Sequence, residues 1–247
     1  MESIAGFTAA QIIAAILATF ASAFVRGLTG FGMAILLVPV LALALLPVEA
    51  VLVTNVLALC IGLSEIGRLV RDAERSAWVI GALVVLATPP GLWALTMTGA
   101  DLARLIIALV ALSAFAAVLL PRRSAAMPAA ATTGGVGIIS GLMTGFAGMP
   151  GPPVVPYYVG RDLPRAAVTA SMLLIFTIAG ATGIGAGVVL GEMSVRLLWL
   201  ALALFPAVLI GNWVGARASG RIAERTWRIC VGLVLGAAAI AAMVRVV

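Results

Sequence analysis

The chain has 247 residues, of which 64% are hydrophobic and 10% are charged. Soluble domains carry about 25% charged residues, so this composition excludes a water-soluble fold. The formal net charge is +6 and every basic residue is an arginine. The absence of histidine removes both the commonest metal ligand and the usual proton carrier at neutral pH.

Ten apolar segments follow one another along the chain. A helix crosses about 30 Å of hydrocarbon with roughly 20 residues, and these segments lack the alternating polar residues of a membrane barrel. They predict an all-α polytopic membrane protein of about eight to ten helices, folded as a single domain over 1–247. The segments cover residues 8–25, 31–46, 50–67, 77–96, 102–120, 131–146, 149–160, 166–190, 196–214 and 228–246.

Two of these segments are poor candidates for uninterrupted spans. Segment 31–46 is short and contains Pro39, and segment 149–160 contains four prolines, beginning with Pro150. Proline removes a helical N–H donor and clashes with the preceding turn. Each segment is predicted to be either a broken helix or one half of a re-entrant hairpin formed with the segment before it.

Several short motifs occur twice, once in each half of the chain. The members of each pair lie at nearly the same separation, which predicts two repeats, about 1–121 and about 125–247. Because each repeat holds five segments, an odd number, the two copies must cross the membrane in opposite directions. The pairs are Thr29-Gly30-Phe31 with Thr144-Gly145-Phe146, Leu46-Pro47 with Leu163-Pro164, and Gly91 and Trp93 with Gly211 and Trp213.

The arginines sort to one side when the gaps between segments are assigned alternately to the two sides of the membrane. Twelve fall on one side and only Arg104, Arg196 and Arg245 on the other. By the positive-inside rule, the Arg-rich loops are cytoplasmic and both termini face outward. The basic charge thus predicts orientation in a lipid bilayer rather than binding to nucleic acid.

The glycine-rich breaks are the best candidates for a binding site. Glycine and proline unwind a helix, and irregular backbone within a membrane is tolerated where it lines a cavity. A helix N-terminus that points into such a cavity offers N–H groups and partial positive charge to an anion. Arg26, beside the first break, either attracts an anion towards it or simply sets the topology. The predicted substrate-binding residues are Thr29, Gly30, Phe31, Gly32, Thr54, Asn55, Thr144, Gly145, Phe146, Gly148, Gly151 and Ser171.

The sequence leaves a structural alternative open for each of these features. Glycines also serve as small-residue contacts between helices, the interpretation preferred for Gly183, Gly187 and Gly191, and polar side chains also form interhelical hydrogen bonds. Glu65 and Arg68 lie one helical turn apart and are predicted to form a local ion pair.

The residue inventory argues against other kinds of site. There is no nucleophile–base pair and no metal-binding motif, so we expect no enzyme activity and no cofactor. No carboxylate cluster falls in mid-span, so a cation substrate has little support. The predicted partner is a small anionic solute. A coupling ion (H⁺ or Na⁺), a homodimer, another small solute and a non-transporting subunit remain open alternatives.

The paired motifs resemble those of the TauE/SafE family of membrane permeases over nearly the whole chain. The resemblance rests on the break at 27–32, the Leu-Pro-x-x-Ala-Val start that ends in Thr54-Asn55, and the second copy between 144 and 171. It implies a secondary transporter in the bacterial inner membrane that moves sulfite, or a sulfur-containing organic anion such as sulfoacetate, by alternating access. The family often has a Thr-Ser pair where Thr54-Asn55 stands, so the resemblance implies an altered ligand preference at Asn55.

Overall fold

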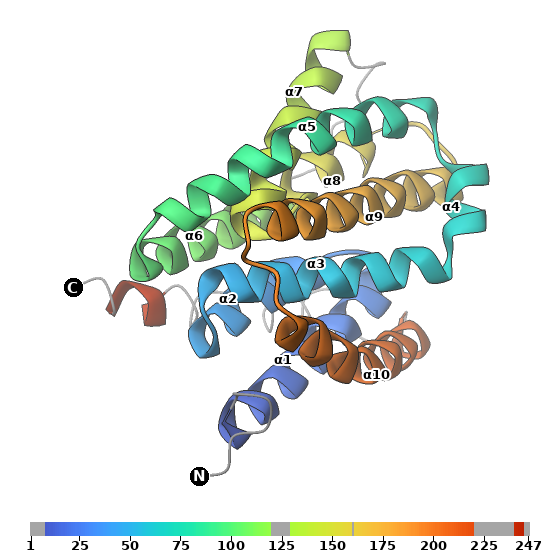
Figure 1. Ribbon diagram of the computed structural model, residues 1–247. Coiled ribbons are helices and arrows are strands. Elements are labelled where there is room, and N and C mark those ends of the chain that lie inside the picture. The colour runs from blue at the N-terminus through green and yellow to red at the C-terminus, as the bar shows by residue number, and fades with distance from the viewer. Residues whose placement is uncertain (1–7, 120–128, 160, 220–239, 245–247) are drawn as a thin grey trace.

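The structure is a computed structural model that describes residues 8–119, 129–159, 161–219 and 240–244. Within these residues every regular element is a helix, which confirms the predicted all-α fold. The predicted segments coincide with helices, except that a separate short helix follows the third and the tenth lies mostly outside the described residues. The helices, labelled in Figure 1, are α1 (Ala9–Thr29), α2 (Met33–Ala44), α3 (Pro47–Ser64), α4 (Ile66–Asp72), α5 (Arg75–Met97), α6 (Ala100–Leu119), α7 (Ala130–Ala147), α8 (Gly151–Val159), α9 (Arg165–Val189) and α10 (Val195–Ala218).

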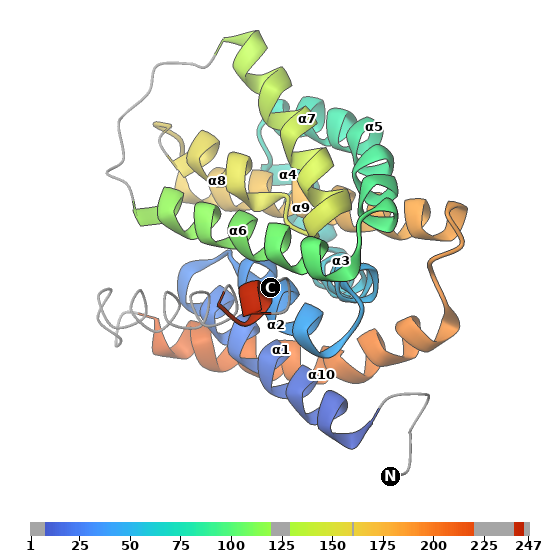
Figure 2. The same ribbon diagram turned by 90° about the vertical axis from the view of Figure 1, so that its left-hand side faces the viewer.

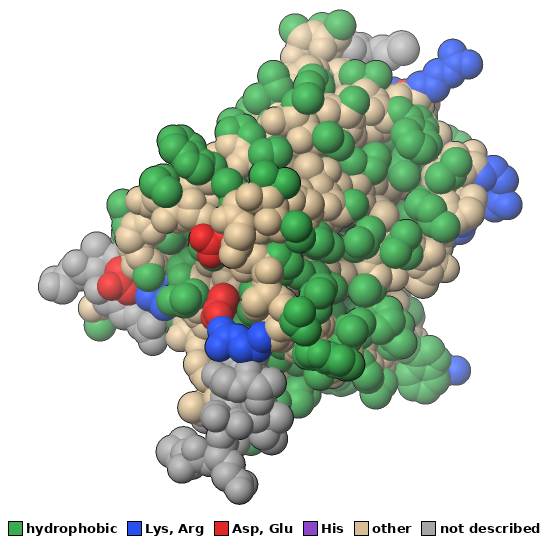
Figure 3. Space-filling view, viewed as in Figure 1, with side chains coloured by type: hydrophobic (Ala, Val, Ile, Leu, Met, Phe, Trp, Pro, Cys, Tyr) green, Lys and Arg blue, Asp and Glu red, His purple; other side chains and the backbone are tan. Residues whose placement is uncertain are grey.

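Among the described residues, six helices are long and apolar enough to cross a membrane, namely α1, α3, α5, α7, α9 and α10. Large hydrophobic side chains on their outer faces are exposed, and hydrophobic side chains spread over the face shown in Figure 3. Leu86 and Val189, for example, are 72% and 85% exposed. Such a surface suits hydrocarbon rather than water, so the chain is a multi-pass membrane protein.

Exposed tryptophans lie near the ends of two of these helices. Trp78 and Trp93 lie within roughly two turns of opposite ends of α5, and Trp199 and Trp213 are placed likewise on α10. Indole rings prefer the level of the lipid headgroups. The paired rings therefore fit an α5 and an α10 that each cross the whole bilayer.

Helices α2 and α8 are too short to cross a bilayer on their own. The 12 residues of α2 and the 9 of α8 span about 18 and 14 Å at 1.5 Å per residue. Each helix returns to the end at which the preceding helix began. Gln11 Nε2 donates to the Ala44 carbonyl at 2.7 Å, and the hydroxyls of Thr133 and Tyr157 lie 2.9 Å apart. Of the two alternatives that the sequence left open, the structure has the re-entrant hairpins.

The first helix of each half packs against the fourth segment of the other half. Helix α1 lies along α10 and α7 lies along α5, as Figures 1 and 2 show. Both contacts use glycine. A Cβ at Gly211 would lie 2.6 Å from the Phe20 carbonyl oxygen, and one at Gly145 would lie 2.8 Å from the carbonyl carbon of Gly91. Such close backbones are typical of small-residue packing in membranes, and the exchange of partners is what a two-fold relation between the predicted repeats requires.

Helices α3 and α9 pack on each other between these two pairs. A Cβ at Gly180 would lie 2.7 Å from the Asn55 carbonyl oxygen, and Gly183 and Gly187 lie against side chains of α3. The interpretation of Gly183 and Gly187 as packing glycines is therefore confirmed. For Gly191 it was wrong, because this residue has a φ of 75° in the turn after α9 and no neighbouring atom near its Cβ position.

The arginines gather at two ends of the molecule in unequal numbers. At the end where α4 lies, called the α4 end below, Figure 3 shows basic side chains along the right-hand edge. At the opposite end, called the far end, Arg104 donates to the carbonyls of Ala42 and Leu45, and Arg196 pairs with Glu49. The described arginines at or near the α4 end are Arg26, Arg68, Arg71, Arg75, Arg161, Arg165 and Arg217. Their distribution agrees with the sorting predicted from the sequence.

Candidate anion-binding pocket

The two breaks in the helical chain meet at one pocket. The pocket has an empty volume of about 740 Å³, its mouth included, and it extends to Glu65 and Leu69 at the α4 end. Its walls come from the α1–α2 and α7–α8 breaks and from the facing sides of α3 and α9. Residues of the breaks that line it are Phe31, Gly32, Met33, Gly148, Met149, Pro150 and Gly151.

Glycines in the left-handed region make both breaks. Helix α1 ends at Gly30, whose φ is 87°, and α2 starts after Gly32, whose φ is 93°. Helix α7 ends at Gly148, whose φ is 65°. Residues with a side chain seldom adopt these angles, so glycine allows the chain to leave one helix and enter the next within three residues.

The second break lies one helical turn later than the repeated motif predicted. Thr144, Gly145 and Phe146 are all still within α7, which continues to Ala147. The structural counterpart of Gly30 is therefore Gly148, and the counterpart of Gly145 is Gly27, which packs against the α10 backbone. The pairing of Gly30 with Gly145 was wrong because three-residue motifs built from common residues can match by chance one turn out of register.

The wall contributed by the first half is rich in hydrogen-bond donors. Asn55 on α3 is 2% exposed, and its Nδ2 has no hydrogen-bond partner among the described residues. Helix α2 begins at the pocket without a capping side chain, so the N–H groups of Met33 and Ala34 in its first turn are not capped. A buried donor without a partner is energetically costly, and an uncapped helix start suits a bound anion.

Arg26 adds a fixed positive charge to the same wall. Its side chain is 9% exposed, and Nη1 donates to Asn212 Oδ1 on α10 at 2.8 Å. Nη2 lies 3.8 Å from a carboxylate oxygen of Glu65, which is too far for a hydrogen bond. A guanidinium group has five N–H donors, so most of those of Arg26 stay available to a ligand in the pocket.

The wall contributed by the second half is largely apolar. Helix α8 also begins at the pocket, but Pro152 and Pro153 remove two of the N–H donors of its first turn. From α9, Leu173 and Phe176 face the cavity, while Thr177 donates its hydroxyl to the Leu173 carbonyl of its own helix. The side-chain donors that are not bonded to their own helix therefore come from the first half, within a lining that is otherwise mostly apolar.

Comparison of the sequence with family profiles shows to which family of membrane proteins the chain belongs. The family described as sulfite exporter TauE/SafE matches residues 14–242. The chain belongs to the TauE/SafE family. It is accordingly a member of a family of membrane transporters, and the resemblance seen in its motifs is confirmed. No curated protein and no solved structure matches the chain.

Some of the residues predicted to bind substrate in this TauE/SafE chain lie away from the pocket, with their hydroxyls bound to backbone. Thr54 and Thr144 are fully buried, and each donates to the carbonyl four residues earlier in its own helix, at 2.8 and 2.7 Å. Thr29 bonds to the Val25 and Phe31 carbonyls and thereby shapes the first break. Gly30 is exposed beside it.

The remaining predicted residues of the second half are also outside the pocket, apart from Gly148 and Gly151. Gly145 packs on α5, and Phe146 lies in a separate apolar groove between α5, α6 and α7. Ser171 is buried near the start of α9, where its Oγ accepts the N–H of Glu74 at 2.8 Å.

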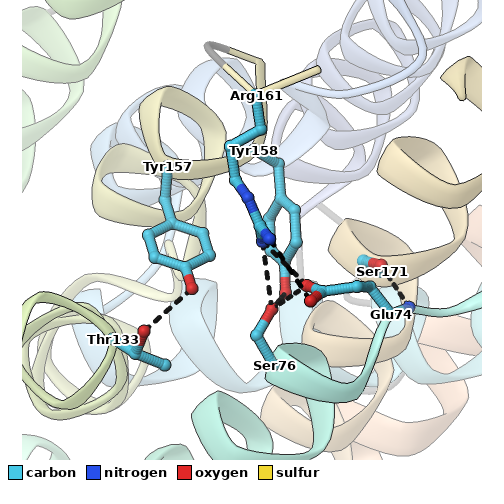
Figure 4. Close-up of polar contacts among 7 residues, drawn as sticks. All are labelled: Glu74, Ser76, Thr133, Tyr157, Tyr158, Arg161 and Ser171. Carbon is cyan, nitrogen blue, oxygen red and sulfur yellow. Dashed lines mark hydrogen bonds and ion pairs between the residues drawn. The ribbon is translucent and has the colours of Figure 1, made fainter. Parts of the chain in front are cut away.

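Ser171 belongs to a polar network at the α4 end, shown in Figure 4. Arg161 pairs with Glu74 at 2.8 Å, and the hydroxyls of Ser76 and Tyr158 lie 2.7 Å apart. Burial tends to raise the pKa of the Glu74 carboxyl, but hydrogen bonds from Arg161 and Ser76 outweigh it and hold the pKa below its usual value. The network ties the end of α8 to α5 and α9, so its role is to hold the hairpin in place.

The α9 residues that line the TauE/SafE pocket were not predicted from the sequence. Leu173, Phe176 and Thr177 follow the spacing of one helical face, which is a usable signal, but nothing in an apolar span indicates which face meets a cavity. Asn212 on α10 accepts a hydrogen bond from Arg26 and so positions its guanidinium. Among the described residues, no group of three or more His, Cys, Asp or Glu side chains is placed to hold a metal ion.

Proposed function

We propose that the protein is a secondary transporter that carries a small sulfur-containing oxyanion across the bacterial inner membrane. The observation that carries this proposal is the donor wall of the pocket. There, Asn55 with its unpartnered Nδ2, the uncapped start of α2 and Arg26 line the same pocket from three elements. All three are groups that bind negative charge, and membership of the TauE/SafE family supports a sulfur anion as their ligand.

The apolar wall refines the choice of anion. Sulfite would use only the donors, whereas an organic sulfonate would also place carbon against Leu173 and Phe176; in sulfoacetate this is the single CH₂ group, and both of its charged ends would bind donors. Displacing water from that wall adds hydrophobic stabilisation of about 0.8 kcal/mol per buried CH₂ group. We therefore expect a short organic sulfonate to bind more tightly than sulfite.

The transport cycle would alternate the access of this pocket between the two sides. The pocket extends to the α4 end, which carries most of the described arginines and is cytoplasmic under the positive-inside rule. At the far end, Gln11 and Arg104 bind the last carbonyls of α2, and Arg196 on α10 pairs with Glu49 on α3. These contacts support a cytoplasm-facing state. Opening the other way would require the two halves to move relative to each other.

The coupling ion is the least constrained part of the proposal. Neither H⁺ nor Na⁺ has a dedicated carboxylate site among the residues lining the pocket, where Glu65 is the single acidic side chain. Flux measured under an imposed proton gradient, an imposed Na⁺ gradient and no gradient separates the two ions from facilitated diffusion.

Flux in proteoliposomes tests the proposed function. Radiolabelled sulfite and sulfoacetate should enter in a saturable manner, and each should inhibit entry of the other. Asn55→Leu replaces the amide by an aliphatic side chain like that of Leu173 on the facing helix. It should reduce flux at least tenfold, because a hydrogen bond to a charged group contributes about 1.5–3 kcal/mol. Thr54→Val is the matched control, since Thr54 precedes Asn55 but bonds only to its own helix. Flux of a cation with none of any sulfur oxyanion would reject the proposal.

A further inference from the structure

Glu65 lies between two arginines at the mouth of the pocket. It stands where α3 ends and α4 begins, and it lines the cavity together with Arg26. One carboxylate oxygen faces Arg26 Nη2 at 3.8 Å, and the other forms a close ion pair with Arg68, as the sequence predicted. Glu65 thus offers a negative charge to the same guanidinium that the proposed substrate would need.

The two arginines differ in how far they are removed from water. The Arg26 side chain is 9% exposed, whereas the Arg68 side chain is 48% exposed. Asn212 on α10 binds one end of the Arg26 guanidinium, which makes no other hydrogen bond among the described residues. An incoming anion could therefore take over Arg26 while Glu65 kept Arg68 as its partner.

We infer that Glu65 is an internal counter-ion that competes with the transported anion for Arg26. With the pocket empty, its carboxylate balances the buried charge of Arg26. When a sulfur oxyanion binds, the carboxylate moves away from Arg26 and keeps its ion pair with Arg68, and its return towards Arg26 assists release of the anion. The inference rests on the proposed function, because it presupposes an anion in this pocket.

This arrangement follows from the energetics of buried charge. A guanidinium group that is nearly removed from water needs a compensating charge or strong hydrogen bonds. A carboxylate in direct contact with Arg26 would block the binding of an anion. Glu65, at 3.8 Å and paired with Arg68, balances the charge of Arg26 and can still be displaced by an anion. Glu65 therefore lowers the affinity for the anion and raises the rate at which the anion leaves.

The test compares Glu65→Gln and Glu65→Asp with the unaltered protein and with Asp72→Asn. Asp72 pairs with exposed Arg71 on α4 and does not line the pocket, so it controls for loss of a carboxylate at the same end. Binding of sulfite and of sulfoacetate is measured by calorimetry in detergent. Initial rates of the same anions are measured in proteoliposomes.

Glu65→Gln is expected to bind both anions about tenfold more tightly, because a nearby negative charge has been removed, and to transport them with a lower KM and a lower kcat. Glu65→Asp keeps the charge and should restore most of the kcat, while Asp72→Asn should match the unaltered protein. A merely structural role for Glu65 would instead lower expression or raise KM.

The outcomes separate this inference from the proposed function. If the unaltered protein binds neither anion, the proposed function fails. If it binds both and Glu65→Gln binds them with equal or lower affinity, only the role of Glu65 is overturned.

Discussion

The two re-entrant hairpins have the same course but different chemistry where they meet. In each, a long helix ends at a glycine with positive φ and a short helix starts at the pocket. The α2 start presents N–H donors, and the wall beside it carries Arg26 and Asn55. The α8 start is blocked by prolines, and the wall beside it carries Leu173 and Phe176. Two hairpins of the same course therefore supply the shape of the pocket, while a few residues in one half supply its charged and amide donors.

The comparison also shows that two glycines from one sequence motif differ in role. Gly30 sits at the end of α1 with φ of 87° and open space around its Cβ position. Gly145 sits in the middle of a helix contact, where a Cβ would meet the backbone of α5. The first is needed for a backbone angle and the second for a close approach, so the same substitution at each should have different consequences.

The largest expected effect is on assembly of the second hairpin. Gly145→Val should prevent folding, because its side chain would collide with the carbonyl of Thr88 and the backbone of Gly91, neither of which can move aside. Gly30→Ala meets no atom and should lose only about 1–2 kcal/mol through backbone strain. Yield of monodisperse protein and its thermal midpoint distinguish the two variants. Equal behaviour would show that the contact between α7 and α5 is not as close as described.

The next largest effect is expected when the pocket wall of the second half is given a polar side chain like that of the first half. Leu173→Asn would give the apolar wall a donor of the kind that Asn55 provides opposite it. We expect sulfite to bind this variant better than the unaltered protein and sulfoacetate to bind it less well as the contact with its CH₂ group weakens, so that the ratio of the two affinities changes about tenfold. Competition between the two anions in one assay gives the ratio directly. An unchanged ratio would mean that the substrate does not touch α9.

A smaller effect should follow when the start of α2 is made to look like the start of α8. Ala34→Pro copies the proline that α8 carries at Pro152 and removes one N–H donor. Proline is tolerated in the first turn of a helix, so the fold should persist. Anion affinity should fall about fivefold to tenfold, in line with the roughly 1 kcal/mol that a typical hydrogen bond contributes. Ala34→Ser, which keeps the N–H, is the control, and equal affinity in both variants would exclude this helix start from the site.

Much of the fold could be predicted from the sequence, whereas the roles of several site residues could not, for physical reasons. Apolar length and the proline pattern located the helices and the two interrupted segments, because these depend on the chain alone, whereas the choice between broken span and hairpin needed the packing. The roles of Thr54 and Thr144 could not be predicted from the sequence. A threonine hydroxyl in a helix can bind a ligand or the carbonyl four residues earlier, and the packing around it decides which. The same holds for Gly145, whose use depends on the helix opposite.

The smallest expected effect concerns how the free ends of the two hairpins are held. The end of α2 is held by Gln11 and Arg104 bonding to carbonyls, groups that do not titrate in the acidic range, whereas the end of α8 is held through Arg161 and Glu74. Because the pKa of Glu74 is lower in the folded protein than in the unfolded chain, its stabilisation is present above the ordinary carboxyl pKa of about 4.3 and is lost as the pH falls through the lowered value.

The thermal midpoint measured between pH 7 and pH 3 should therefore contain a small decline that Glu74→Gln removes, corresponding to about 1 kcal/mol for a partly exposed pair. Gln11→Ala, at the far end, should lower the midpoint by a constant amount at every pH, since the bond it removes carries no titrating group. If Glu74→Gln declined with pH as steeply as the unaltered protein, the acid sensitivity would arise elsewhere, and the two hairpin ends would be equivalent in this respect.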